Sequence, residues 1–246
     1  MKLLAGYFLL FLPAISAVPK FEDWHCGHTE DILLMTYNMT IFNCIDVAYD
    51  WNHCCVLHDE CYTHQRGQSV CDTLFCECTK RALNKPGRNV DQECKDYNRI
   101  ACLAMPFVGT DAYEKSINYT EPEDFKKYLP KDKELAAIFG LLYRECPHNN
   151  ASISSCALMF NDCFNTTEVC KMDLYNCIHD IYNIYQETSC GHQTRQIREI
   201  LQPSWLRVNW IWIATFFLIV FIATVKFFWC RNIRNRKNPI YFQINP

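Results

Sequence analysis

This chain has no excess of positive charge. Its 246 residues carry 24 lysines and arginines against 27 acidic residues, for a formal net charge of −3 at pH 7. The sequence therefore has no basic footprint for nucleic acid, and we expect no nucleic-acid partner. Strand signals are sparse, and no internal repeat or low-complexity tract stands out. These absences favour a mainly α fold of one sizeable domain or two small ones.

Cysteine, by contrast, is abundant. Of the 17 cysteines, all but Cys230 precede a long apolar segment near the C-terminus. An even number on that side predicts eight disulfides formed in an oxidising compartment. Zinc clusters are the alternative, but Cys76-x-Cys78 and the adjacent pair Cys54-Cys55 are poor spacings for tetrahedral ligation. The expected class is therefore disulfide-rich as well as mainly α.

Two apolar stretches predict how the chain meets a membrane. Residues 1–17 read as a signal peptide, because Lys2 precedes a short apolar run that ends in small residues. An uncleaved anchor is the alternative, although the run is too short to span a bilayer comfortably. Residues 208–229 predict a transmembrane helix with aromatic anchors near both ends. A buried core helix or a lipid-anchor signal is the other reading of that segment.

The C-terminal residues set the expected orientation. Residues 230–246 form a basic tail, and no acidic residue follows Glu199. The positive-inside bias then places this tail in the cytoplasm and the preceding residues outside. We therefore expect a single-pass type I membrane protein of the secretory pathway or cell surface. Cys230, at the inner boundary, is either a palmitoylation candidate or a plain reduced thiol.

Four acceptor sequons for N-glycosylation agree with this orientation, because all of them precede the apolar segment. They begin at Asn38, Asn118, Asn150 and Asn165.

Turn and spacing signals divide the ectodomain. Helices are expected from Ile45 to about Gln65 and from Ser69 to Leu83, with Gly67 breaking them. The expected order is a disulfide-rich domain over 18–102, a helical connector over 103–145, a cysteine-rich helical hairpin over 146–190 and a polar stalk over 191–207.

The hairpin region has a regular cysteine spacing. Cysteines recur every seven residues from Cys156 to Cys177, and residues seven apart share a helix face. Two antiparallel helices would then oppose these cysteines in nested pairs. The predicted pairs are Cys163–Cys170, Cys156–Cys177 and, outermost, Cys146–Cys190.

The run from Cys54 to Tyr62 carries the strongest chemical signal. In a helix, His58 and Tyr62 share a face, and Asp59 is turned by about 100° from His58, so that both can line one cavity. A neutral imidazole can take a proton from water near pH 7. A carboxylate can hold a hard cation that polarises a carbonyl. An imidazole and a carboxylate placed in this way are the smallest set of functional groups that metal-assisted ester hydrolysis requires.

The pattern Cys-Cys-x-x-His-Asp-x-Cys-Tyr from Cys54 to Tyr62 resembles the active-site helix of secreted phospholipase A2. The segment from Cys76 to Ala82 resembles the second long helix of that family, and the likeness looks closest to a short, divergent invertebrate branch. It implies a phospholipase A2-like two-helix core within 18–102 that cuts the sn-2 ester of membrane glycerophospholipids. In that reading, His58 is the base, Asp59 binds calcium and Tyr62 belongs to the supporting hydrogen-bond network. The family pairing also implies a Cys61–Cys78 disulfide.

Two departures from the family pattern count against catalysis. The family's calcium loop is glycine-rich and lies just upstream of the paired cysteines, whereas Met35 to His53 contains no glycine. Thr79 stands where the family has the aspartate that orients the histidine. Asp72 would replace that aspartate only if the short connection brought it round, which we do not expect.

Other interpretations stay open. The ectodomain is either an active hydrolase or a catalytically inactive domain that binds lipid or a protein partner. A disulfide-rich receptor or adhesion domain is a third possibility. A zinc site of His53, His58 and His64 fits by residue type, but its spacing is off the helical i, i+4 pattern.

Overall fold

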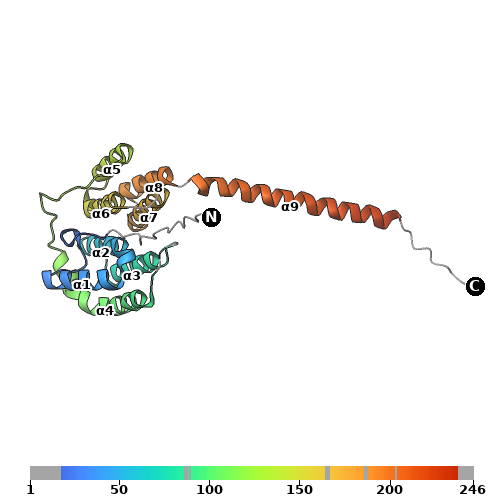
Figure 1. Cartoon of the computed structure of the whole chain (residues 1–246). Coiled ribbons are helices and arrows are strands. Elements are labelled where there is room, and N and C mark those ends of the chain that lie inside the picture. Colours follow the sequence, from blue (N-terminus) through green and yellow to red (C-terminus); the bar gives the residue numbers. More distant parts are fainter. Residues whose placement is uncertain are drawn as a thin grey trace, which may run out of the picture. The chain divides into compact units, whose positions relative to one another are not determined.

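The computed structural model describes residues 18–85, 88, 90–163, 167–185, 188–202 and 204–237. The expected signal peptide at 1–17, the sequon at Asn165 and the end of the tail at 238–246 lie outside the described residues. The chain divides into two compact units, residues 1–201 and 202–246. The described part is helical and contains no strand, as the sparse strand signals predicted (Figure 1).

The first helices follow from local capping and turn signals. Helix α1 (Glu30–Asn43) starts after Thr29, whose side chain accepts the amide hydrogen of Ile32. Helices α2 (Ala48–Thr63) and α3 (Gln68–Leu83) are joined by a tight reversal in which Gln65 and Gly67 have positive φ. Helix α4 (Gln92–Ser116) is capped by Asp91 and continues across the boundary expected at residue 102.

The remaining helices of the first unit are α5 (Lys133–Glu145), α6 (Asn150–Asn161), α7 (Thr167–Tyr185) and α8 (Ser189–Leu201). The expected polar stalk therefore begins as a helix. Ile197 and Leu201 of α8 are buried, which the polar composition of that segment did not indicate. The first unit extends to Leu201, so these residues belong to the folded body and do not form a spacer.

One hydrophobic core serves both halves of this unit. It joins Trp51 and Leu57 of α2 to Phe139 of α5, Ile153 of α6 and Ile178 of α7. The hairpin is therefore packed into the same core as the domain that carries the His-Asp motif.

All sixteen cysteines before the apolar segment are paired. The pairs are Cys26–Cys55, Cys44–Cys94, Cys54–Cys78, Cys61–Cys71, Cys76–Cys102, Cys146–Cys190, Cys156–Cys177 and Cys163–Cys170. The nested pairing of the hairpin is confirmed.

The implied Cys61–Cys78 disulfide is wrong, because Cys61 bonds Cys71 and Cys78 bonds Cys54. In two antiparallel helices joined by a short turn, residues equally far from the turn lie opposite each other. Cys61 and Cys78 would be offset by two helical turns, or roughly 10 Å, which no disulfide can span.

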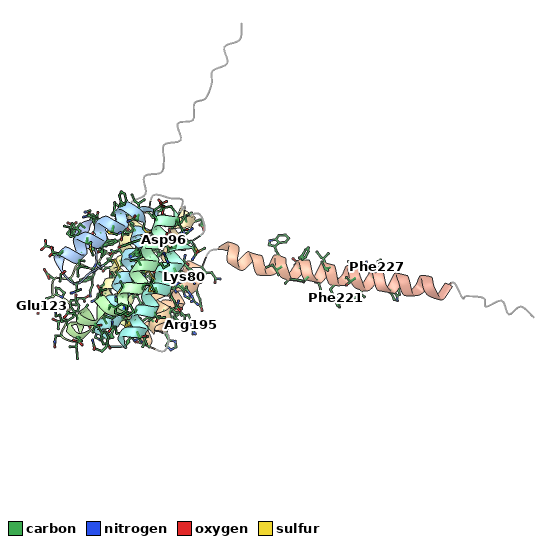
Figure 2. The ribbon with its side chains drawn as sticks, turned by 90° about the horizontal axis from the view of Figure 1, so that it is seen from below. Lys80, Asp96, Glu123, Arg195, Phe221 and Phe227 are labelled. Carbon is green, nitrogen blue, oxygen red and sulfur yellow. A yellow bond between two sulfur atoms is a disulfide. The ribbon has the colours of Figure 1, made fainter. Side chains whose placement is uncertain are left out.

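The second unit contains helix α9 (Ser204–Lys237). Within the described residues, no single helix meets the length and hydropathy expected of a membrane span. In α9 the apolar stretch is Trp212–Phe227, which is shorter than a membrane span requires. The segments Glu30–Asn43 and Ile45–Thr63 have the length and hydropathy of a span only when taken together, and a 110° bend separates them. Phe221 and Phe227 project from α9 (Figure 2).

Candidate functional site

A histidine, a carboxylate and a phenol meet between α2 and α3. Asp72 Oδ1 lies 2.9 Å from His58 Nε2 and accepts a hydrogen bond from the Tyr62 hydroxyl at 2.6 Å. All three side chains are buried, and the rings of His58 and Tyr62 are 4.1 Å apart at their centroids. The Cys61–Cys71 disulfide, one residue before both Tyr62 and Asp72, fixes this arrangement.

Asp72 is held in its charged form. Burial by itself raises the pKa of its carboxyl, but hydrogen bonds from His58 and Tyr62 outweigh burial, and the pKa lies below its usual range. A charged carboxylate at Nε2 keeps the Nε2–H tautomer of His58, which leaves Nδ1 as the proton acceptor. This is the orienting role that the sequence had failed to assign.

The expectation that Asp72 would stay away from His58 is therefore wrong, and Thr79 does not take that role. The Thr79 hydroxyl is fully buried and donates to the backbone carbonyls of Phe75 and Cys76, within its own helix. The signal that could have found Asp72 is its position directly after Cys71, once Cys71 is paired with Cys61.

Gly109 of α4 packs directly against the Tyr62 hydroxyl. A β-carbon at Gly109 would collide with that oxygen, whereas one at Gly140 of α5 would meet no atom within 4 Å. We expect Gly109→Ala to displace Tyr62 from Asp72 and to lower the free energy of unfolding by about 1–3 kcal/mol. Gly140→Ala is the matched control and should raise it by about 0.5–1 kcal/mol, because alanine favours helix interiors. Equal effects in denaturant unfolding would contradict this account of Gly109.

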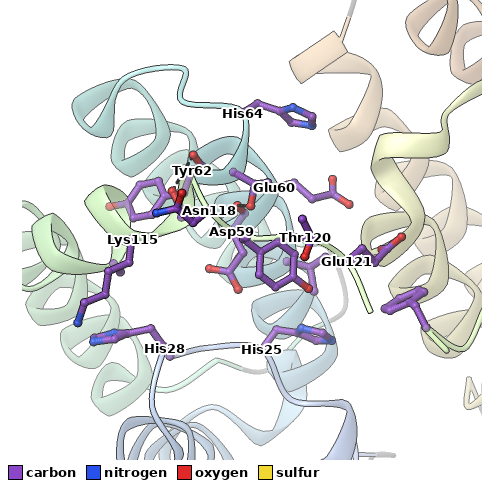
Figure 3. A pocket seen from close by; sticks show the side chains of 18 of the residues that line it. His25, His28, Asp59, Glu60, Tyr62, His64, Lys115, Asn118, Thr120 and Glu121 are labelled. Carbon is purple, nitrogen blue, oxygen red and sulfur yellow. Dashed lines mark hydrogen bonds between the residues drawn. The ribbon is translucent and has the colours of Figure 1, made fainter. Parts of the chain in front are cut away.

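Asp59 lines a separate and larger cavity of about 840 Å³ (Figure 3). Its side chain is exposed to that cavity. No hydrogen bond or ion pair joins its carboxylate to another side chain in the described part of the chain. The pKa of the Asp59 carboxyl is raised above its usual range, first because the surrounding protein removes part of its solvent and second because Glu60 lies nearby. An unpaired carboxylate of this kind is suited to a cation.

A loop from the start of the chain faces Asp59 across this cavity. His25, Gly27 and His28 line the cavity, and Figure 3 shows both histidines on the side opposite Asp59. Gly27 has φ +144°, and a β-carbon there would meet Ile32 at 2.7 Å, so the loop requires glycine at this point. The Cys26–Cys55 disulfide ties the loop to α2 one turn before Asp59. The glycine-containing loop that lines the Asp59 cavity is thus formed by residues 25–29 and not by the glycine-free stretch from Met35 to His53.

His58 and Asp59 do not line the same cavity, contrary to the sequence expectation. His58 borders a smaller cavity of about 220 Å³, whereas Asp59 and Tyr62 line the larger one. The physical reason is the bond to Asp72, which turns the imidazole toward α3.

The zinc site of His53, His58 and His64 is not formed. His53 is buried beside the Cys156–Cys177 disulfide, His58 is bonded to Asp72, and His64 lines the larger cavity next to His148. Across the described residues, His53, Cys156 and Cys177 are the one set of three potential metal ligands close together. Those cysteines are bonded to each other and offer no thiolate.

The described sequons differ in exposure. Asn38 and Asn118 are exposed, and Asn118 also lines the larger cavity. Asn150 is buried and donates its amide hydrogen to Glu121 at 2.5 Å. Glycosylation at Asn38 and Asn118 stays a prediction, whereas a glycan on Asn150 would require this contact to break.

Glu60 attaches α2 to the hairpin. Its buried carboxylate accepts hydrogen bonds from the Asn149 side chain and from the backbone amide of Ser152, both at 2.9 Å, at the start of α6. Burial raises the pKa of Glu60 to about 7 despite these bonds.

A raised pKa means that the folded state binds more protons than the unfolded state between the two pKa values. The Glu60 contribution to stability should therefore be fully present below its unfolded pKa of about 4.5 and be lost as the pH rises to about 7. We expect the free energy of unfolding to fall by roughly 3 kcal/mol across this window through Glu60. Glu60→Gln should flatten that pH dependence in denaturant titrations, and parallel wild-type and variant curves would contradict it.

Part of this chain is similar to a curated protein of Caenorhabditis elegans. Over 100 residues the chain is 31% identical to phospholipase A2-like protein Y52B11A.8 of Caenorhabditis elegans. The matched part is 40% of this chain and 55% of that protein, so the chain spans about half the length of the curated relative that it matches. This similarity supports a phospholipase A2-like family. No family model matches the chain, and no solved structure matches it.

Proposed function

We propose that this chain is a phospholipase A2-like hydrolase that cuts the sn-2 ester of glycerophospholipids with calcium. The observation that carries the proposal is the buried contact of His58 and Tyr62 with Asp72. A charged carboxylate behind a histidine is how hydrolases orient a general base. The phospholipase A2-like name of the relative supports the same reaction class.

Each residue has a definite part in this reaction. His58 Nδ1 takes the proton of the attacking water, while Asp72 holds the tautomer and stabilises the imidazolium that forms. Tyr62 fixes Asp72 in place. Asp59 and backbone carbonyls of the 25–29 loop are the oxygens that would hold calcium, which prefers such ligands. Bound there, the ion would polarise the ester carbonyl.

An exposed apolar surface supports a lipid partner. The Cys44–Cys94 disulfide at one end, and the 3.7 Å approach of His28 to Asp111 at the other, hold α1 and α4 side by side and antiparallel. These helices expose Phe42 at 88% and Phe107 at 83%. Other exposed apolar residues on them are Leu34, Met35, Met39, Ile100, Leu103 and Val108. Exposed apolar groups at this density mark interaction surfaces, and membranes are among their partners. We propose a phospholipid membrane as the partner, with residues 208–229 as the tether of a type I protein.

The test is hydrolysis of mixed phospholipid–detergent micelles by the purified full-length chain. We expect fatty acid release from the sn-2 position that requires calcium, is abolished by a chelator and is absent in His58→Gln. Equal background release by wild type and His58→Gln, in both low and high salt, would overturn the proposal. Release that depends on His58 but ignores the chelator would remove calcium from it.

A second candidate is a catalytically inactive ectodomain that binds lipid or a protein partner. The observation in its favour is the separation of His58 and Asp59 into two cavities. In that case the chain should bind phospholipid vesicles through Phe42 and Phe107, while hydrolysis stays at background.

A further inference from the structure

The cavity beside His58 is closed on one side by the hairpin. Residues of α2 and α3, among them Leu57 and Phe75, form one side of its wall, and Asp180, Asn183 and Ile184 of α7 form the other (Figure 1 shows these helices). His58 itself is 8% exposed. At about 220 Å³ the cavity is smaller than the roughly 300–1,000 Å³ that small-molecule sites occupy. A glycerophospholipid therefore does not fit beside His58 while α7 is in this position.

Polar contacts hold this part of α7 against the catalytic helices. Arg81 of α3 donates to Asp180 at 2.8 Å, and the Arg81 side chain is 49% exposed. Arg66, in the α2–α3 turn, donates to the backbone carbonyl of Ile184 at 2.6 Å. Its guanidinium also lies 4.9 Å from the centre of the Tyr185 ring. Exposed ion pairs and cation–π contacts are each worth little and weaken in salt.

The apolar residues of the same segment belong to the core that both halves of the unit share. Helix α7 packs mainly against α8, and Ile181 is fully buried. The Cys146–Cys190 disulfide joins the start of α8 to the residue that follows α5. The Cys156–Cys177 disulfide and the buried ion pair of Lys85 with Asp173 hold α7 up to Cys177. Only the end of the helix, from Asp180 to Tyr185, can therefore move away from α3 once the arginine contacts are broken, and no disulfide has to be cut.

We propose that the C-terminal half of α7 is an autoinhibitory cover over His58, held closed by Arg66 and Arg81. Breaking these two contacts admits substrate to the histidine. The inhibitory meaning of the cover rests on the proposed function, but its existence does not, because access to His58 can be measured without any hydrolysis.

The test is chemical labelling of the full-length chain. Diethyl pyrocarbonate modifies accessible neutral imidazoles, and peptide mapping gives the labelling rate at His58 relative to the exposed His192. We expect the His58 rate to rise about tenfold in Arg66→Ala/Arg81→Ala. Arg99→Ala, which removes an exposed ion pair with Asp96 on α4, is the matched control and should leave the rate unchanged. An unchanged His58 rate in the folded double variant would overturn the proposal.

Two further measurements test the proposal if that variant fails to fold. Asp180→Asn removes the negative charge from the Arg81 contact and should raise the rate about threefold. Raising the salt from about 0.05 M to about 0.5 M should raise it in the wild type as well. Salt-independent labelling together with an unchanged Asp180→Asn rate would refute the cover. Faster labelling without any hydrolysis would keep the cover and refute the hydrolase instead.

Discussion

Asp72→Asn should reduce sn-2 ester hydrolysis by about 10²–10⁴-fold while leaving the helices and disulfides intact. An asparagine oxygen can still accept the Tyr62 hydroxyl, so packing is kept. The substitution removes the negative charge that fixes the Nε2–H tautomer of His58 and that stabilises its protonated form. The measurement is the initial rate of fatty acid release under saturating calcium, and the loss should fall on kcat more than on KM.

Thr79→Val provides the control for this experiment. Thr79 occupies the position at which the family resemblance expects the orienting aspartate, yet its hydroxyl bonds only within α3. Valine has nearly the same shape and removes only a hydroxyl that bonds back to carbonyls of its own helix, so activity should stay within about twofold of wild type. A large loss in Thr79→Val together with an active Asp72→Asn would show that the orienting group has been assigned to the wrong residue.

Lys85→Met should lower the free energy of unfolding by about 3 kcal/mol. Lys85 contacts both Asp50 of α2 and Asp173 of α7, and all three side chains are at most 14% exposed. The two carboxylates raise the pKa of Lys85 against the effect of burial, so the ammonium is charged. Methionine fills the space of the lysine stem but leaves two buried carboxylates with Arg88 as their remaining partner.

The measurement for Lys85→Met is guanidinium unfolding of the oxidised chain, in which a lower midpoint at unchanged slope reports lost stability. Lys80→Met, on the outer surface of α3, is the matched control and should fall within about 0.5 kcal/mol of wild type (Figure 2). Similar midpoints for the two variants would mean that the buried cluster contributes nothing.

The sequence predicted most of what depends on local spacing. The seven-residue cysteine repeat gave the hairpin pairs, because helix periodicity alone decides which side chains share a face. The two helices around Gly67 were also predicted to within a few residues. The disulfide that the family resemblance implied for Cys61 was wrong. That pairing came from the place of Cys78 in the Cys76-x-Cys78 motif, whereas the actual partner is set by distance from the α2–α3 turn, which places Cys71 opposite Cys61.

The site itself depends on contacts between distant segments, which local patterns do not determine. Asp72 reaches His58 only because the α2–α3 turn pairs Cys61 with Cys71. The 25–29 loop is held at the Asp59 cavity by the Cys26–Cys55 disulfide and by the hydrogen bond from the His25 amide to Asn52. Neither contact is visible from composition or periodicity, since both require knowing which cysteine bonds which.

The single core shared by α2, α5, α6 and α7 has a consequence for evolution of the chain. A gene product that stopped at Glu145 would leave the buried Glu60 without its two hydrogen-bond donors, Asn149 and Ser152, and would leave Leu57 without the α7 residues beside it. The cysteine-rich hairpin therefore cannot be lost or exchanged between genes as an independent cassette. A relative that keeps the His-Asp helix but lacks the hairpin must carry different side chains on the face of that helix that α6 and α7 cover here.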